Sequence, residues 1–381
     1  MEVEVLNVKC TIWIVMSSML IISAVSMAAE YPIPPKTEKA QIKRAMHSFP
    51  KVGKYEVLCG DFHIHTKYSD GKPSPVERVQ EAWEYGYDVI AITDHGNFKA
   101  YAEAKPVADA LGLLLIRGLE TGMAGKEHLV ALGVTADYKP IKPHAWDLTS
   151  GDGKVYYKDE LNKLGKMGAS VVYAHPHVGF EEVVRWGVDE GYIHGLEVKN
   201  TVVGSGWNTI QSHGTWCYPN GFKWAMDNGI TVFANSDAHA VRADYGGMRE
   251  RTVTLVLAKN RTNKAVMDAF RNHRTIAWFN GMLWGKESLL NDLMKSMIKV
   301  GQTIGADGTA WITIENMGPV SLQLSPLPAT ANQKPVSLGA YEKLLISRPA
   351  KAVNLEIKWD NIWINPDVNF QNLYRLMKDD E

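Results

Sequence analysis

The sequence predicts an α/β barrel followed by a small antiparallel β module. Apolar runs of strand length, such as Asp88–Thr93 (DVIAIT), Leu113–Leu119 (LLLIRGL) and Ile230–Asn235 (ITVFAN), alternate with helix-like segments. Buried strands separated by helices are typical of a parallel sheet that is covered on both faces. Their number favours closure of that sheet into a barrel. From Gly301 onward, alternating segments separated by prolines and glycines indicate antiparallel strands.

The first thirty residues are expected to lie outside this fold. Thr11–Ala29 has no charged residue and carries small residues at Ser26 and Ala28, as a secretory signal peptide does before its cleavage site. If it is not cleaved, the same segment is long enough to anchor the chain in a membrane. We therefore expect an exported protein, periplasmic or secreted, with four parts: a signal peptide or anchor (1–29), an extension (30–56), the barrel (57–299) and a β-rich domain (300–381).

Charge and cysteine content exclude some classes of protein. Lys and Arg number 41 against 42 Asp and Glu, so no cationic surplus is present to neutralise a nucleic acid, and no stable nucleic-acid partner is expected. The three cysteines form no CxxC site for zinc or redox chemistry. After removal of the signal, Cys59 and Cys217 remain, and a disulfide between them is permitted but not indicated by their spacing.

The predicted elements follow in order along the chain. The first helix, Ser74–Tyr85, has a serine N-cap, Pro75 at its first position and Glu77 three residues after the cap, and Gly86 ends it. A second helix, Phe98–Leu111, should be broken or kinked by Pro106. The remaining helices are expected at Lys158–Met167, Glu181–Glu190, Asn263–Asn272 and Glu287–Ile298. The remaining strands are expected at Val57–His65, His128–Val134, Ser170–Ala174, Gly195–Lys199, Ala310–Glu315, Val320–Leu324 and Val353–Trp359.

Imidazoles and carboxylates gather where the predicted strands of the barrel end. His63 and His65 are two residues apart on a strand, so their rings project from one face. The other members of this set are Asp70, Asp94, His95, Glu120, His128, His175, Asp237 and His239. In a parallel barrel the carboxyl ends of the strands open onto one face, where active sites are built. Because imidazole and carboxylate together suit Zn, Mn, Fe or Co, the pattern predicts a site for several divalent metal ions.

These motifs also carry a family resemblance. The segments HIHTKYSDG, TDH, GLE with HLVALG, AHP and SDAH, in this order between Gly60 and Ala277, resemble the PHP superfamily (polymerase and histidinol phosphatase). The resemblance implies a distorted barrel of seven βα units that holds two or three divalent ions (Zn, Mn or Fe). The run from Arg251 onward and the β-rich tail resemble a narrower group, the exported phosphodiesterases of the Sb-PDE kind.

Carried across residue by residue, the resemblance implies three groups of metal ligands. The first group is His63, His65, Glu120 and Asp237. Glu120 would bridge to a second ion held by His128 and His175, and Asp70, His95 and His239 would hold a third.

The predicted metals point to the hydrolysis of phosphate esters. Two close divalent ions activate a water and clamp the oxygens of a phosphate, and no GxSxG or catalytic Cys–His motif supplies a nucleophile instead. We therefore expect a multinuclear metal-dependent phosphodiesterase that acts on a small phosphate ester. The alternatives are a phosphomonoesterase of histidinol-phosphatase type, an exonuclease for small oligonucleotides, and a noncatalytic protein that binds metal or a ligand.

Further residues are candidates for supporting roles. Asp94 is expected to orient a neighbouring imidazole, and His95 or His239 to protonate the leaving alkoxide. His177 and Lys199 are candidate phosphate contacts, with a hydrogen-bonded loop histidine and a solvent-exposed lysine as the respective alternatives.

A long segment with glycines and aromatic residues follows the strand that contains Lys199. Val202–Pro219 is a candidate lid whose Trp207, Trp216 and Tyr218 would stack on an apolar ester group. The alternative is a loop packed against the C-terminal module.

Overall fold

A computed structural model describes residues 44–123, 127–140, 153–176, 182–201, 210–212, 215–241, 252–327, 335–348 and 354–376. The segment predicted to be a signal peptide or anchor lies outside these residues. Among the described helices, none combines the length and the apolar character needed to cross a membrane.

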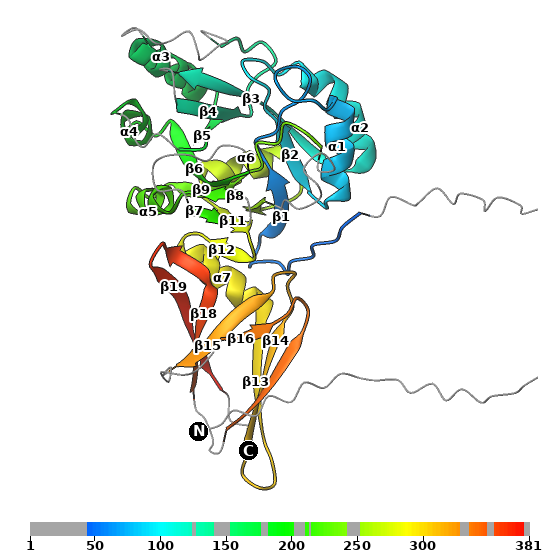
Figure 1. Cartoon of the computed structure of the whole chain (residues 1–381), viewed down its shortest axis with the longest axis vertical. Helices are drawn as coiled ribbons and strands as arrows, with labels where there is room; N and C mark the ends of the chain where they lie inside the picture. The colour runs from blue at the N-terminus through cyan, green and yellow to red at the C-terminus, as the bar shows by residue number, and fades with distance from the viewer. Residues whose placement is uncertain are drawn as a thin grey trace, which may run out of the picture.

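The described chain forms an α/β barrel that stands on a β-rich module (Figure 1). The strands of the barrel are β1 (Glu56–Asp61), β2 (Val89–Ile92), β3 (Leu114–Met123), β4 (Glu127–Leu132), β5 (Ser170–Tyr173), β6 (Ile193–Asn200), β9 (Thr231–Ala234) and β10 (Val253–Ala258). They pair in the order β10-β1-β2-β3-β4-β5-β6-β9. This architecture confirms the predicted α/β class.

Side-chain hydrogen bonds connect β10 and β9, the strands at the two ends of this order. The Thr254 hydroxyl in β10 accepts a hydrogen bond from the Ala234 amide and donates one to the Ala234 carbonyl, both at 2.9 Å. The hydroxyls of Thr231 in β9 and Thr275 in the neighbouring β11 (Thr275–Phe279) are 2.6 Å apart. The seam between the first and last strands of the barrel is therefore made by threonines rather than by a continuous backbone ladder.

The direction of the strands is mixed, whereas the sequence predicted a parallel sheet. β1, β2 and β3 are parallel, as are β5, β6 and β9. However, β4 runs antiparallel to both β3 and β5, and β10 runs antiparallel to β1. The cause at β4 is the length of the connection, since only three residues separate β3 from β4, and a parallel crossover needs about a dozen or more.

The helices are α1 (Pro75–Glu84), α2 (Ala100–Leu111), α3 (Gly153–Lys166), α4 (Glu182–Asp189), α5 (Pro219–Asp227), α6 (Asn263–Arg271) and α7 (Glu287–Met297). The predicted capping box of α1 is present, with Ser74 and Glu77 bonding each other's backbone. Pro106 does not break α2, because the helix continues through it, and the predicted kink stays a prediction. Ala100, Ala104 and Ala108 are buried along one face of α2, and this packing holds the helix across the hydrogen bond that Pro106 cannot donate.

Large aromatic side chains fill one part of the barrel core. The rings of Phe62, Phe233 and Phe270 are fully buried and meet edge to face, with the centroids of Phe62 and Phe270 4.8 Å apart. Phe270 comes from α6, so this helix contributes directly to the interior.

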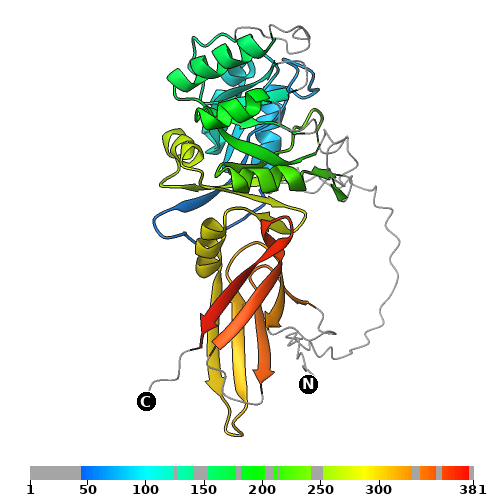
Figure 2. The same ribbon diagram turned by 90° about the vertical axis from the view of Figure 1, so that its left-hand side faces the viewer.

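The C-terminal module is antiparallel, as predicted, but it is not separate from the barrel. β13 (Ile298–Ile304), β14 (Ala310–Asn316) and β17 (Lys343–Arg348) form a three-stranded sheet. The other strands are β15 (Leu322–Leu327), β16 (Val336–Leu338), β18 (Asn354–Asn365) and β19 (Val368–Arg375). β18 pairs in parallel with β12 (Met282–Trp284), which continues the barrel ladder into the module (Figure 2).

Candidate metal centre

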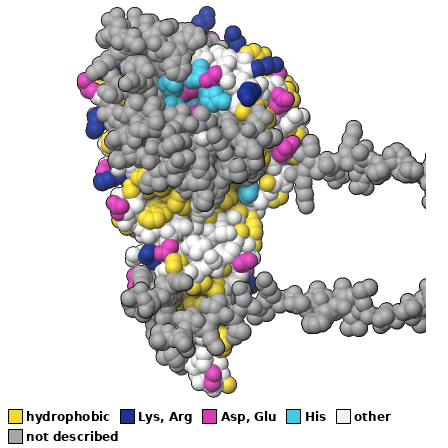
Figure 3. Space-filling view, in the orientation of Figure 1, with side chains coloured by type: hydrophobic (Ala, Val, Ile, Leu, Met, Phe, Trp, Pro, Cys, Tyr) yellow, Lys and Arg dark blue, Asp and Glu magenta, His cyan; other side chains and the backbone are white. Residues whose placement is uncertain are grey.

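The nine residues predicted as metal ligands lie together at one end of the barrel. Figure 3 shows histidine and acidic side chains exposed side by side in the upper part of the molecule. All nine belong to groups whose ligand atoms lie within 4.8 Å of one another: His63, His65, Asp70, His95, Glu120, His128, His175, Asp237 and His239. The structure thus brings the predicted residues together, and their role as ligands stays a prediction.

Four donor atoms surround the most buried position. His63 Nε2 lies 3.1 Å from His65 Nε2, 3.2 Å from Glu120 Oε2 and 3.4 Å from Asp237 Oδ1. His65 Nε2 lies 3.2 Å from the same Glu120 oxygen and 3.1 Å from the same Asp237 oxygen. Metal–ligand bonds of about 2.1 Å place neighbouring donors roughly 3.0–3.4 Å apart in octahedral or tetrahedral geometry. All five of these spacings fall within that range.

The second carboxylate oxygen of Glu120 faces a different pair of imidazoles. Glu120 Oε1 is 2.7 Å from His128 Nδ1 and 3.1 Å from His175 Nε2. Since its other oxygen belongs to the first group, Glu120 is placed to bridge two ions.

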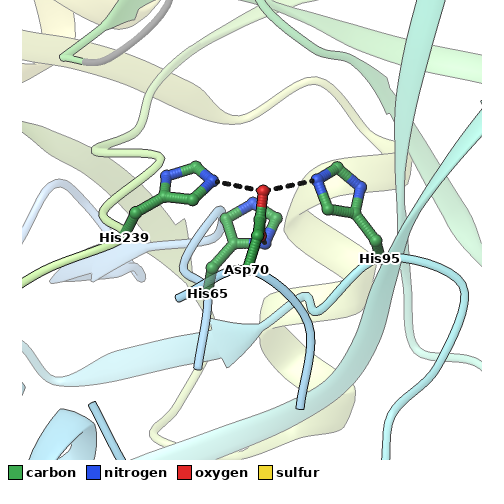
Figure 4. A group of neighbouring side chains, drawn as sticks. All are labelled: His65, Asp70, His95 and His239. Atoms are coloured by element: carbon green, nitrogen blue, oxygen red, sulfur yellow. Dashed lines mark hydrogen bonds and ion pairs between the residues drawn. The ribbon is translucent and has the colours of Figure 1, made fainter. Parts of the chain in front are cut away.

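The third group lies nearer to solvent. Asp70 Oδ2 is 3.1 Å from His239 Nε2 and 3.4 Å from His95 Nε2, so it stands between the two rings (Figure 4). His65 Nδ1 approaches the other oxygen of Asp70 at 3.4 Å. The side chain of Asp70 is 52% exposed, whereas that of Glu120 is 1% exposed. This difference makes the third group the most accessible part of the centre.

The buried groups of the centre strongly shift one another's pKa values. Burial alone would lower the pKa of His63, but Asp237, Glu120 and Glu197 raise it well above its usual value. Burial likewise opposes the charged form of His65, whose hydrogen bonds to Asp237 and Glu120 raise its pKa to about 9. For Glu120, the neighbouring His63 and His128 outweigh burial and hold its pKa well below its usual value. The buried imidazoles and carboxylates thus stabilise each other's charged forms.

The backbone places these side chains with short extensions of the strands. β1 ends at Asp61 rather than at His65 as predicted, yet Ile64 still forms a parallel bridge with Ala238. The Asp237 amide donates to the His63 carbonyl at 2.7 Å. Two of the predicted ligands, His175 and Asp237, have positive φ angles of 21° and 53°. Such strained conformations in non-glycine residues concentrate at functional sites.

Glu197 is a buried carboxylate that the sequence analysis did not single out. Its Oε1 lies 2.8 Å from His63 Nδ1 and accepts from Asn235 at 2.9 Å. Its Oε2 accepts from the His175 amide at 2.8 Å and from Asn200 at 3.1 Å. A glutamate in the middle of the apolar strand GLEVK was the signal, because a fully buried acid requires partners.

A chain of hydrogen bonds connects Asp94 to an imidazole through the hydroxyl of Ser69. It accepts hydrogen bonds from the amide and the hydroxyl of Thr66, both at 2.7 Å, and from the Ser69 hydroxyl at 2.8 Å. Ser69 Oγ is in turn 3.2 Å from His65 Nδ1. Asp94 is therefore linked to His65 through Ser69, and its role in orienting that ring stays a prediction.

The remaining candidates have different outcomes. Lys199 is fully buried, with its ammonium 5.8 Å from the centre of the Phe279 ring, so the solvent-exposed alternative is wrong and a role in phosphate binding would require it to move. His177 lies outside the described residues. Cys59 and Cys217 are both buried as thiols, without a disulfide between them.

The candidate lid is partly a β-hairpin. β7 (Ile210–Ser212) pairs with β8 (Thr215–Cys217). β8 in turn pairs antiparallel with the end of β6, where Cys217 lies opposite Lys199. Tyr218 is fully buried, so it is not available to stack on a substrate. Trp207 lies outside the described residues.

Comparison with known proteins agrees with this geometry. Residues 61–203 match the family model of the PHP domain. Over these residues the chain is similar to PHP domains. The narrower Sb-PDE-type group stays a prediction.

Two kinds of protein are similar to this chain: polymerases that match part of its sequence, and a solved structure that matches most of its fold. A DNA polymerase III of PolC type from Staphylococcus epidermidis is 36% identical over 102 residues, which are 26% of this chain but only 7% of that polymerase. The corresponding protein of Staphylococcus saprophyticus is 39% identical over 102 residues, 6% of its length. The chain therefore spans a small fraction of these polymerases. A two-domain protein from Bacteroides vulgatus, described as containing a predicted PHP-like metal-dependent phosphoesterase, superposes with a TM-score of 0.73 at 23% identity over 88% of this chain and 99% of its own. This last likeness shows that the barrel and the β module occur together in another protein.

Proposed function

We propose that this protein is a metal-dependent hydrolase of small phosphate esters that prefers phosphodiesters and is exported from the cytoplasm. The observation that carries the proposal is Glu120, whose two oxygens face two separate sets of imidazoles. The coarser part of the proposal, hydrolysis of phosphate esters, is supported by the PHP domain and by the description of the Bacteroides vulgatus protein.

The donor set suits two or three ions of the Zn, Mn or Fe class. The residues that would hold them are the nine described above, whose ligand atoms form four overlapping groups. Ions held there would lower the pKa of a water toward neutrality and neutralise charge on phosphoryl oxygens.

The chain's own residues supply orientation and a proton. Glu197 and the Asp94–Ser69 pair fix the rings of His63 and His65. His95 and His239 have side chains that are 18% and 25% exposed, so either ring, when it does not hold the third ion, can donate a proton to a leaving alkoxide. Their shared contact with Asp70 holds both rings toward the open side of the centre.

Hydrolysis of bis(p-nitrophenyl) phosphate beside p-nitrophenyl phosphate tests the proposal. The protein starting at Glu30 is assayed with Mn or Zn and, as a control, with a chelator. We expect faster turnover of the diester, its loss with the chelator and in Asp237→Asn, and its retention in Asp109→Asn, which alters an exposed carboxylate on α2.

Other results would redirect the proposal. Preference for the monoester would favour a phosphatase of the histidinol-phosphatase type. Turnover of neither ester by protein that still holds metal would favour a binding protein. For export, the chain expressed with its own N-terminus should appear outside the cytoplasm, and retention of the full-length chain inside the cell would refute that part.

A further inference from the structure

A second site lies on the outer wall of the barrel, beside the metal centre. A pocket of about 390 Å³ is bounded by the turn after β2, the start of α2 and the chain that follows β4. Its wall includes Phe98, Lys99, Tyr101, Arg117, Tyr138 and Lys139. We infer that this pocket binds a small molecule that joins an anionic group to a flat apolar body, as aryl phosphates and nucleotides do.

Uncompensated positive charge supports the anionic part of this ligand. Among the described residues, Lys99, Arg117 and Lys139 make no salt bridge with a carboxylate, although the same structure pairs Lys105 with Asp109 and Arg274 with Asp268. Three cations around one pocket repel one another, and an anion that enters relieves this repulsion.

Arg117 is held in a fixed orientation by aromatic rings. Its guanidinium carbon lies 4.3 Å from the centre of the Tyr101 ring and 5.7 Å from that of Phe98. Stacking covers the faces of a guanidinium and leaves the N–H groups at its edge available for an anion. One of these groups donates a long 3.4 Å bond to the Val134 carbonyl. The rings of Phe98, Tyr101 and Tyr138 supply the apolar wall for the rest of the ligand.

The start of α2 adds to the positive potential. This twelve-residue helix begins at the pocket, and its N-cap residue, Lys99, makes no capping bond with its side chain. The positive end of the helix dipole therefore faces the pocket, where Asn97 Oδ1 accepts a hydrogen bond from the Lys99 amide at 3.1 Å. Glu103, the acid in its first turn, is engaged by the Tyr68 hydroxyl at 3.1 Å and by Lys67 at 3.6 Å.

The pocket is distinct from the metal centre. Arg117 and Glu120 lie three residues apart on β3, so their side chains project from opposite faces of the strand. Gly96 and Asn97 line the pocket and directly follow His95, so the two sites share the turn after β2.

Binding of phenylphosphonate to the chelated protein, measured by titration calorimetry, tests this inference without the metal centre. We expect one binding site, lost in Arg117→Met and weakened about tenfold in Lys99→Glu. Lys264→Glu makes the same charge change at an exposed position outside the pocket and should bind as the wild type does.

Three results would overturn the inference. They are absence of binding in the chelated protein, binding that appears only with metal, and unchanged binding in Lys99→Glu. Because Lys99 is exposed, misfolding would not explain a loss of binding in that variant. Inorganic phosphate should bind more weakly than phenylphosphonate, and equal binding would refute the role of the aromatic wall. Because the chelated protein is inactive in the proposed reaction, these outcomes are independent of the phosphodiesterase assay.

Discussion

Replacement of Glu197 by Gln should weaken metal binding although Glu197 is not among the predicted ligands. Glu197 receives hydrogen bonds on both oxygens, from His63 and Asn235 on one and from the His175 amide and Asn200 on the other. A glutamine has only one oxygen. If its amide group faces the His175 amide and Asn200, three donors meet without an acceptor.

The other orientation of the glutamine harms the metal site directly. If its amide group faces His63, the Nδ1 atom must accept, and the proton moves to Nε2, the atom directed at His65, Glu120 and Asp237. A protonated Nε2 cannot bind a metal ion. Loss of a partner that orients a metal-binding histidine costs about 10- to 100-fold in affinity, which corresponds to roughly 1.4–2.8 kcal/mol.

Competition with a chromophoric chelator measures this loss, and elemental analysis counts the ions that remain. Glu160→Gln is the matched control, because Glu160 is also buried but lies on α3, where it accepts from the Tyr138 hydroxyl. Wild-type affinity in Glu197→Gln, or an equal loss in Glu160→Gln, would refute the proposed action through the His63 ring.

Three further predictions follow from the same contacts. His65→Ala should abolish turnover and remove at least one equivalent of metal, and full activity in this variant would disprove the assignment of His65 as a ligand. In the chelated protein, the pKa of His65 is raised from 6.5 to about 9, so its stabilising charge is complete below pH 6.5 and is lost as the pH rises through 9. Thermal melts should show a loss of stability of roughly 3 kcal/mol over this window, whereas a flat profile would contradict the charged contact. Truncation before Gly301 removes β18 from β12 and exposes apolar core, so we expect aggregation, and a monodisperse fragment would show that the barrel core is independent of the module.

Local sequence signals predicted most of what the site contains. The capping box at Ser74 and Glu77 depends on residues three positions apart, and the structure confirms it. The pair His63 and His65 likewise needs only the two-residue repeat of an extended chain to bring the Nε2 atoms within 3.1 Å. Both cases succeed because the interaction is contained within a few residues.

Contacts between distant segments were not predictable in the same way. Glu197 meets His63 across 134 positions, and no local pattern relates the two residues. β10 was not among the predicted strands, although it lies beside β1 and is buried along its whole length. The pairing of β12 with β18 links segments that hydrophobic periodicity describes only one at a time.

The reversal of β4 explains how a partly wrong topology still selected residues that the structure brings together. His128 stands near the beginning of β4, and a strand beginning would lie at the closed end of a wholly parallel barrel. Because β4 runs antiparallel to β3, its first residues instead lie beside the last residues of β3, with His128 opposite Gly122 and Val130 opposite Glu120. The Ala174 amide then donates to the His128 carbonyl at 3.0 Å, which sets His128 next to His175 at the end of β5. The site therefore depends on which strand ends meet at one edge. A reversed strand contributes its first residues to that edge, whereas a parallel strand contributes its last.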